Sequence, residues 1–277
     1  MTRPVLNVRA RARSLRVAAL AAVFVASLAG CGSQDTPAND APNNTSSGAA
    51  STVSGEVTVF AAASLTESFT ELGKQFEAAN PDAKVTFNFG GSSALAKQIN
   101  EGAPADVFAS ASPTNMKQVT DAGAATGEPT TFARNTLMIA VPAGNPGGIT
   151  GLADFAKDDK KIALCAEQVP CGAAAKKALD AAGITAKPDT LEQDVKAVLT
   201  KVQLGEVDAA LVYKTDVQSA GDKVEGIEFP ESAKAVNSYP IVPLAEAPNA
   251  TGAKAFVAFV LSGKGRAVLT KAGFDGP

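Results

Sequence analysis

Apolar residues follow two different periods along residues 56–277. Short runs in which they alternate or stand together are typical of β-strands, and segments in which they recur every three or four positions are typical of helices. The pattern begins with a strand at 57–60, followed by a helix that starts at Ser64 and carries Leu65, Phe69, Leu72 and Phe76. Further extended segments are expected at 85–89, 106–109, 137–141, 161–165, 207–213 and 240–243. Further helices are expected around Leu95 and Ile99 and at 115–122, 171–182, 194–204, 253–262 and 265–272.

Strands that alternate with helices in this way are typical of α/β architecture. The second half of the pattern repeats the plan of the first half without repeating its sequence. We therefore predict an α/β fold with two lobes.

The first 30 residues have the organisation of an export signal. A basic segment at 2–16 precedes an apolar run at 17–28, which is too short for a stable transmembrane helix. Small residues directly before Cys31 resemble the bacterial lipobox, in which that cysteine is lipidated; the alternative is a cysteine that stands by chance near an ordinary cleavage site. Residues 31–55 are rich in Ser, Asn, Pro, Thr, Gly and Ala, as in a flexible tether. These features predict an extracytoplasmic domain that is anchored to the cell membrane through a lipid on Cys31.

Composition removes several classes of chemistry. The 277 residues include no histidine, so Ser-His-Asp and Cys-His triads and imidazole metal sites are excluded. Five of the 25 basic residues lie in the first 30 residues, which leaves 20 basic against 28 acidic residues and a net charge of −8. So acidic a domain is a poor partner for nucleic acid, whose phosphates would repel it. We expect no nucleic-acid partner, no direct metal ligands and no cofactor.

Cys165 and Cys171 lie six residues apart in a domain that is predicted to be exported. In an oxidising compartment a disulfide is the default expectation, and two buried free thiols are the alternative. Metal binding by two thiolates without further Cys or His ligands is not expected.

A strand, a small polar or glycine-rich turn and a helix N-terminus follow one another four times, at 60–64, 90–93, 170–172 and 193–195. Helix N-termini present unpaired N–H groups and a partial positive charge, so several that converge on one point make an anion site. None of these turns has the spacing of a P-loop or of a G-x-G-x-x-G dinucleotide motif. The pattern therefore favours a small anion over a nucleotide.

Each of these residues also has a purely structural interpretation. Ser64 and Glu67 fit the S-x-x-E capping box, and Ser92 and Ser93 could likewise cap a helix. The preceding glycine pair could form only a turn, and Tyr213 could be a core aromatic at a strand end. Ser93 and Lys97, four residues apart, could instead form a Ser-Lys nucleophile pair, although no G-x-S-x-G elbow accompanies them.

The order of these motifs closely resembles the molybdate-binding proteins of bacterial ABC importers. The most specific parts are A-A-A-S-L at 61–65 and G-A-P-A-D-V-F at 102–108, and the resemblance also covers F-G-G-S-S, V-P-C-G, E-Q-D-V and A-L-V-Y-K-T-D. It implies a type II periplasmic-binding-protein fold, in which two α/β lobes are joined by two crossing segments. The first lobe would comprise 56–138 and 239–277, and the second 139–238. The crossing segments would lie near 137–142 and 239–243.

The resemblance also implies the ligand set. Ser64 and Ser92 would each offer a hydroxyl and a backbone N–H, Cys171 and Val195 would each offer a backbone N–H, and Tyr213 would offer its phenol. Cys171 departs from the Ala that the family pattern leads us to expect, but a main-chain donor tolerates any small side chain. The implied protein is a monomeric binding protein, not an enzyme, whose partners are a small oxyanion and an ABC permease.

All of these donors are neutral, and the set includes no carboxylate to accept a hydrogen bond from a protonated ligand. Phosphate near neutral pH carries a proton, whereas molybdate, tungstate and sulfate do not. The donor set therefore disfavours phosphate and leaves molybdate, tungstate and sulfate, between which pocket size decides. The resemblance implies molybdate and tungstate as the ligands. The alternatives are a receptor for sulfate or another small oxyanion and, from a different class, the Ser-Lys hydrolase.

Overall fold

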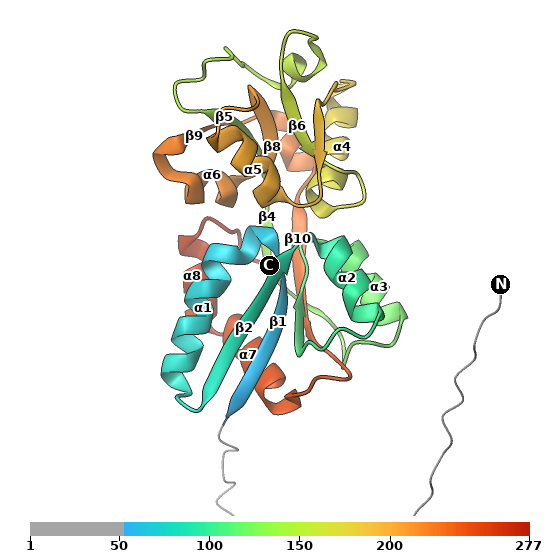
Figure 1. Ribbon diagram of the computed structural model, residues 1–277, viewed down its shortest axis with the longest axis vertical. Helices are drawn as coiled ribbons and strands as arrows, with labels where there is room; N and C mark the ends of the chain where they lie inside the picture. Colours follow the sequence, from blue (N-terminus) through green and yellow to red (C-terminus); the bar gives the residue numbers. More distant parts are fainter. Residues whose placement is uncertain (1–52) are drawn as a thin grey trace, which may run out of the picture. The chain divides into compact units, whose positions relative to one another are not determined.

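The computed structural model describes residues 53–277, which form two α/β lobes, each built on its own five-stranded sheet (Figure 1). The predicted signal peptide, Cys31 and nearly all of the predicted tether lie outside the described residues. Within residues 53–277, no helix is both long and apolar enough to span a membrane. The predicted two-lobed α/β architecture is confirmed.

The sheet of the first lobe has the strand order β2-β1-β3-β10-β4. Its strands are β1 (Gly55–Ala62), β2 (Ala83–Gly90), β3 (Val107–Ala109), β4 (Thr130–Asn135) and β10 (Asn237–Pro243). Its helices are α1 (Thr66–Ala79), α2 (Ser92–Asn100), α3 (Pro113–Asp121), α7 (Ala250–Leu261) and α8 (Gly263–Lys271). In β1, Val57, Val59 and Ala61 pack on α1 and α7, whereas Phe60 packs with α2 and α3. Because successive side chains of a strand point to opposite faces, this pattern places helices on both sides of the sheet.

The sheet of the second lobe has the strand order β7-β6-β8-β5-β9. Its strands are β5 (Leu137–Pro142), β6 (Ile162–Cys165), β7 (Thr190–Glu192), β8 (Ala209–Tyr213) and β9 (Val224–Ile227). Its helices are α4 (Pro170–Ala182), α5 (Val195–Gln203) and α6 (Lys214–Ala220). Short 3₁₀ turns complete the chain at η1 (Ala63–Leu65), η2 (Leu152–Ala156), η3 (Gly221–Lys223) and η4 (Pro230–Lys234). The strands β6 and β8 are buried throughout, as expected for strands covered on both faces.

The chain crosses between the lobes twice. It leaves the first lobe between β4 and β5, and it returns between η4 and β10 (Figure 1). Leu137 and Met138, which the sequence assigned to the first lobe, pair with β8 in the second sheet, and Asn237 and Ser238, which it assigned to the second lobe, pair with β4 in the first sheet. The crossings therefore lie a few residues before the predicted 137–142 and 239–243, because both of those segments are already regular strands.

The predicted disulfide between Cys165 and Cys171 is confirmed. It joins the end of β6 to the first turn of α4, with 5.7 Å between the two Cα atoms. It thereby closes the turn that leads into one of the predicted anion-binding helix N-termini.

Candidate functional site

A small cavity lies where the two lobes meet, and all five residues of the predicted ligand set line it. It measures about 10 Å³. Pockets for drug-sized organic ligands measure about 300–1,000 Å³, so this one admits only a small compact group. Its lining consists of Ala62, Ala63, Ser64, Gly90, Gly91, Ser92 and Ala111 from the first lobe and Val169, Pro170, Cys171, Asp194, Val195 and Tyr213 from the second.

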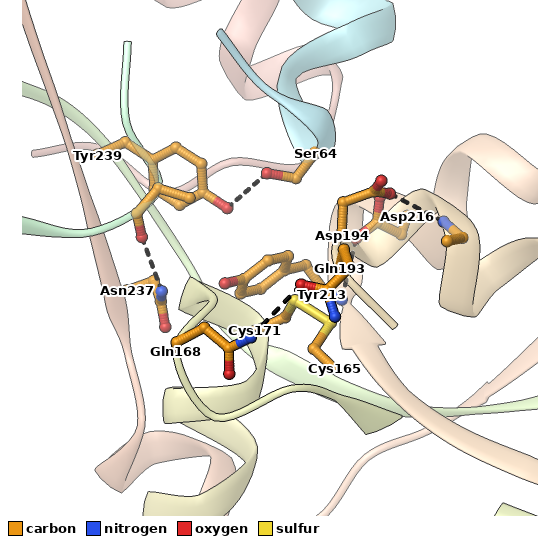
Figure 2. Close-up of a disulfide and its surroundings, with 12 residues drawn as sticks. Ser64, Cys165, Gln168, Cys171, Gln193, Asp194, Tyr213, Asp216, Asn237 and Tyr239 are labelled. Carbon is orange, nitrogen blue, oxygen red and sulfur yellow. Dashed lines mark hydrogen bonds between the residues drawn. A yellow bond between two sulfur atoms is a disulfide. The ribbon is translucent and has the colours of Figure 1, made fainter. Parts of the chain in front are cut away.

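Ser64 lies in η1, between β1 and α1, and its side chain is buried. Its Oγ lies 2.9 Å from the phenolic oxygen of Tyr239 in β10 (Figure 2). The capping-box interpretation of Ser64 is wrong, because α1 begins at Thr66 and no side chain caps its N-terminus. Ser64 is instead held by a hydroxyl partner at the edge of the cavity.

Ser92 is the first residue of α2, directly after the N-cap Gly91. Its buried Oγ accepts a hydrogen bond from the backbone N–H of Ala111 at 3.0 Å. A hydroxyl that accepts from a neighbour keeps its own proton available for donation. Ser92 can therefore donate into the cavity, and its backbone N–H, in the first turn of α2, has no acceptor within the helix.

Cys171 and Val195 stand in the first turns of α4 and α5, so their N–H groups also lack acceptors within their helices. Pro170 occupies the first position of α4, and the disulfide fixes Cys171 to the end of β6. At α5 the N-cap Asp194 accepts from the N–H of Ala197 at 2.9 Å. The Asp194 carboxylate thus accepts from the N–H of Ala197 and not from that of Val195.

Tyr213 ends β8 and is only 1% exposed. Its phenolic oxygen is buried and has no hydrogen-bond partner among the described residues. Burial raises the pKa of this phenol well above its ordinary value, with smaller effects from Tyr239 and Asp216, so the group stays a neutral donor. A buried donor without a partner costs about 1–3 kcal/mol, and a ligand oxygen in the cavity would remove that cost.

The electrostatic character of the cavity comes from dipoles. Three helices of nine residues or more, α2, α4 and α5, direct their N-termini at it. The partial positive charge at each N-terminus favours an anion. Asp194 is the one charged residue among the lining residues, and its carboxylate is engaged as a helix cap. The arrangement can hold a small anion by hydrogen bonds from neutral groups.

The two lobes approach each other closely at Gly91, beside this cavity. A Cβ atom added to Gly91 would lie 2.2 Å from the backbone oxygen of Gln193 and 2.8 Å from a methyl group of Val169, both in the second lobe. The φ of Gly91 is −63°, which any residue adopts without strain. Gly91 is therefore required by the closed arrangement of the lobes and not by its own turn.

The hydrolase interpretation finds no support in the geometry. The side chain of Lys97 is 76% exposed and lies 3.8 Å from Glu101, as an ordinary pair one helical turn apart. Ser93 does not line the cavity. Among residues 53–277, no group of three or more His, Cys, Asp or Glu side chains is placed to hold a metal ion.

The sequence did not single out three side chains that support the site. Tyr239 contacts Ser64, and its ring lies 6.1 Å from that of Tyr213. Asp216 is fully buried, and its Oδ2 accepts from the N–H of Tyr213 at 3.1 Å. Lys196 lies 3.2 Å from Asp216 Oδ1. The available signals were positions near predicted ligand residues: Asp216 ends the A-L-V-Y-K-T-D motif, and Lys196 directly follows E-Q-D-V. Tyr239 is the other of the chain's two tyrosines.

Comparison with known proteins gives the wider context. Residues 57–275 match the family described as bacterial extracellular solute-binding protein. The chain is 44% identical over 258 residues to the molybdate-binding protein ModA of Mycobacterium tuberculosis. The aligned segment covers 93% of this chain and 96% of that protein.

Two solved structures are also similar to the chain. The substrate-binding domain of a putative molybdenum ABC transporter from Clostridium difficile has a TM-score of 0.61 and 29% identity, and covers 80% of this chain and 99% of that one. The sulfate-binding protein SubI of M. tuberculosis has a TM-score of 0.69 and 16% identity, and the match covers 80% of this chain and 86% of that one. At this identity the likeness shows only that the fold is shared. These likenesses agree with the type II periplasmic-binding-protein fold that the sequence implied.

Proposed function

The chain belongs to the bacterial extracellular solute-binding proteins, a family of transport components and not of enzymes, and we propose that it captures molybdate between its lobes for delivery to an ABC importer. The observation that carries the proposal is the set of neutral donors around a cavity of about 10 Å³, in particular the buried phenol of Tyr213 without a protein partner. Ser64, Ser92, Cys171, Val195 and Tyr213 are the proposed ligands.

Hydrogen bonds can compensate the burial of a dianion here. The five residues supply three hydroxyl donors and the backbone N–H groups of Ser64, Ser92, Cys171 and Val195. Each hydrogen bond to a charged group contributes about 1.5–3 kcal/mol, which offsets the loss of hydration. No lysine or arginine is needed in the lining, because the helix dipoles and hydroxyl groups point at the ligand.

The donors also favour molybdate over phosphate. A protonated phosphate oxygen needs an acceptor, and the one carboxylate of the lining, Asp194, uses Oδ1 to cap α5 by accepting from the N–H of Ala197. Sulfate shares the deprotonated state of molybdate, so the choice between them depends on size. The names of the relatives at 44% and 29% identity favour molybdate, whereas the sulfate-binding likeness is 16% identical.

Several finer features complete the proposal. Tungstate would bind as molybdate does, since both are fully deprotonated tetrahedral dianions, and no cofactor would be required. The export signal and Cys31 support a lipid anchor that keeps the domain near its permease at the outer surface of the cytoplasmic membrane. The protein would act as a monomer, since each chain contains both halves of its site.

A thermal-shift and calorimetric panel tests the proposal. Purified protein is titrated with molybdate, tungstate, sulfate and phosphate at equal ionic strength. Molybdate at a thousandfold excess over its dissociation constant should add about 4 kcal/mol to the free energy of unfolding. Sulfate should stabilise the protein less and phosphate hardly at all. A larger shift with sulfate would establish the sulfate receptor instead, and a shift with phosphate alone would refute the donor argument.

A further inference from the structure

One lysine joins the two lobes beside the cavity. Lys196 Nζ in α5 lies 2.9 Å from both carboxylate oxygens of Glu67 in α1, across the boundary between the lobes. The same ammonium lies 3.2 Å from Asp216 Oδ1 and donates to Ser219 Oγ at 3.1 Å, both within the second lobe. A single cation is thus shared between a carboxylate of the first lobe and one of the second.

The positions of these residues relate them to the proposed ligands. Lys196 directly follows Val195 in the first turn of α5, and Glu67 stands three residues after Ser64. Asp216 Oδ2 accepts from the N–H of Tyr213, so this carboxylate contacts both the lysine and a residue of the cavity. The cluster therefore connects elements of both lobes that carry proposed oxyanion-binding residues.

Burial distinguishes the two ion pairs of Lys196. Asp216 is 0% exposed and Lys196 is 23% exposed, so this ion pair lies within the second lobe, although Asp216 Oδ1 forms no hydrogen bond with the ammonium. Glu67 is 53% exposed and contacts Lys196 from the other lobe. Lys196 therefore contacts a buried carboxylate of its own lobe and an exposed carboxylate of the other lobe.

We propose that Lys196 is a positioning residue for oxyanion capture: anchored by Asp216, it binds Glu67 across the cleft and so holds the Val195 and Tyr213 donors against the Ser64 side of the site. This inference rests on the proposed function. Because Glu67 meets Lys196 only in the closed arrangement, the pair stabilises the bound state and slows ligand escape. It has no effect on the folding of either lobe.

Glu67→Gln is the sharpest variant, since it removes the cross-lobe pair and leaves the buried Lys196–Asp216 pair intact. Its matched control is Glu71→Gln, which removes the same charge one turn further along α1, where the carboxylate accepts from Gln75 in its own helix. Lys196→Met would leave Asp216 buried without its cation and would destabilise the fold. Lys196→Arg keeps the charge and is the conservative rescue.

Stopped-flow tyrosine fluorescence reports on the site, because the chain has no tryptophan and its two tyrosines, Tyr213 and Tyr239, lie beside the cavity. The dependence of the observed rate on molybdate concentration separates association from dissociation. Exposed ion pairs contribute little, so Glu67→Gln should release molybdate about 1.4- to fivefold faster than the wild type. Glu71→Gln should match the wild type, and Lys196→Arg should stay within about twofold of it. Urea unfolding without molybdate should be the same for Glu67→Gln and Glu71→Gln.

The outcomes are distinguishable. Equal dissociation rates in Glu67→Gln and Glu71→Gln, with both binding molybdate, would overturn the role of Lys196 and leave the proposed function standing. The role of Lys196 would also be overturned if Glu67→Gln lowered the free energy of unfolding without molybdate by as much as it lowered the activation free energy of dissociation. The pair would then be structural. No molybdate response in the wild type and the control would overturn the proposed function, and the inference with it.

Discussion

The two lobes contribute to the cavity in different ways. In the first lobe, the hydroxyls of Ser64 and Ser92 already have partners, Tyr239 and the N–H of Ala111. In the second lobe, the phenol of Tyr213 is buried with no partner among the described residues, and Cys171 is fixed by a disulfide (Figure 2). The first lobe is therefore preorganised on its own, whereas the second satisfies its buried donor only when a ligand is present.

From this difference we expect a ligand to drive closure of the lobes. Closing the lobes buries the Tyr213 hydroxyl at a cost of about 1–3 kcal/mol unless an acceptor occupies the cavity. A ligand that accepts from both lobes binds the closed state more tightly than the open one and shifts the equilibrium toward it. The Tyr213 phenol should therefore make the closed arrangement less favourable when no anion occupies the cavity.

Gly91→Ala should have a large effect on binding. The added methyl group would lie 2.2 Å from the Gln193 oxygen, so the lobes could not close fully. Overpacking costs about 1–3 kcal/mol, which corresponds to roughly a five- to hundredfold loss of molybdate affinity by calorimetry. The free energy of unfolding without molybdate should not fall, because the backbone of Gly91 suits alanine. Gly263→Ala, whose Cβ would meet open space, is the control; wild-type affinity in Gly91→Ala would show that ligand binding does not need this approach.

Tyr213→Phe isolates the asymmetry between the lobes. It keeps the ring and deletes one donor, so molybdate affinity should fall by about 1.5–3 kcal/mol, or roughly ten- to a hundredfold. Stability without molybdate should not decrease, because the lost hydroxyl has no protein partner. Tyr239→Phe, which removes the partner of Ser64, should in contrast lower stability as well. If Tyr213→Phe binds molybdate as the wild type does, its phenol is a core group and not a ligand.

Reduction of the Cys165–Cys171 disulfide tests the bracing of the second lobe. For so short a loop the chain-entropy model gives roughly 2 kcal/mol of stabilisation. Urea unfolding with and without reductant measures this value, and calorimetry on the reduced protein measures the affinity. Binding should weaken too, because the N–H of Cys171 stands in the turn that the bond closes. Loss of stability with unchanged affinity would separate the disulfide from the site.

The pH dependence of stability should show a smaller contribution from Asp216. Burial raises the pKa of this carboxyl to about 6, against the opposing effects of Lys196 and of the Tyr213 N–H. The folded protein therefore holds this proton more tightly than the unfolded chain, and the stability it gives is lost as the pH rises from about 4 to about 6. The slope is at most about 1.4 kcal/mol per pH unit.

Urea unfolding from pH 4 to pH 7, compared between the wild type and Asp216→Asn, isolates this contribution from those of the neighbouring Glu67 and Lys196. The difference between the two proteins should change steadily from about pH 4 to about pH 6 and then level off. A constant difference would show that Asp216 does not titrate there.

The sequence predicted the elements whose apolar residues repeat over several turns or strand positions, such as α1 with Phe69, Leu72 and Phe76. It missed β4, β7, β9 and α6. In β7 none of the three residues is buried, and β9 contains Gly226 between two exposed or half-buried positions, so neither has a strong apolar pattern. Regular structure there comes from pairing with neighbouring strands.

The part of the candidate site that lies in local sequence motifs could be predicted. The turns that hold Ser64, Ser92, Cys171 and Val195 are visible as small residues before helices. The contact of Ser64 with Tyr239 spans 175 residues, and the constraint on Gly91 comes from Gln193 in the other lobe. The first contact depends on how distant strands pair within the first lobe, and the second depends on how the two lobes meet. No local pattern contains either.

Small-angle scattering with and without molybdate tests the central claim, that an oxyanion closes the two lobes by satisfying donors from both. The radius of gyration should decrease on adding molybdate, stay unchanged with phosphate, and decrease less in Gly91→Ala. A wild-type radius that does not change with molybdate under conditions where calorimetry detects binding would contradict the account, since the site would then exist without closure.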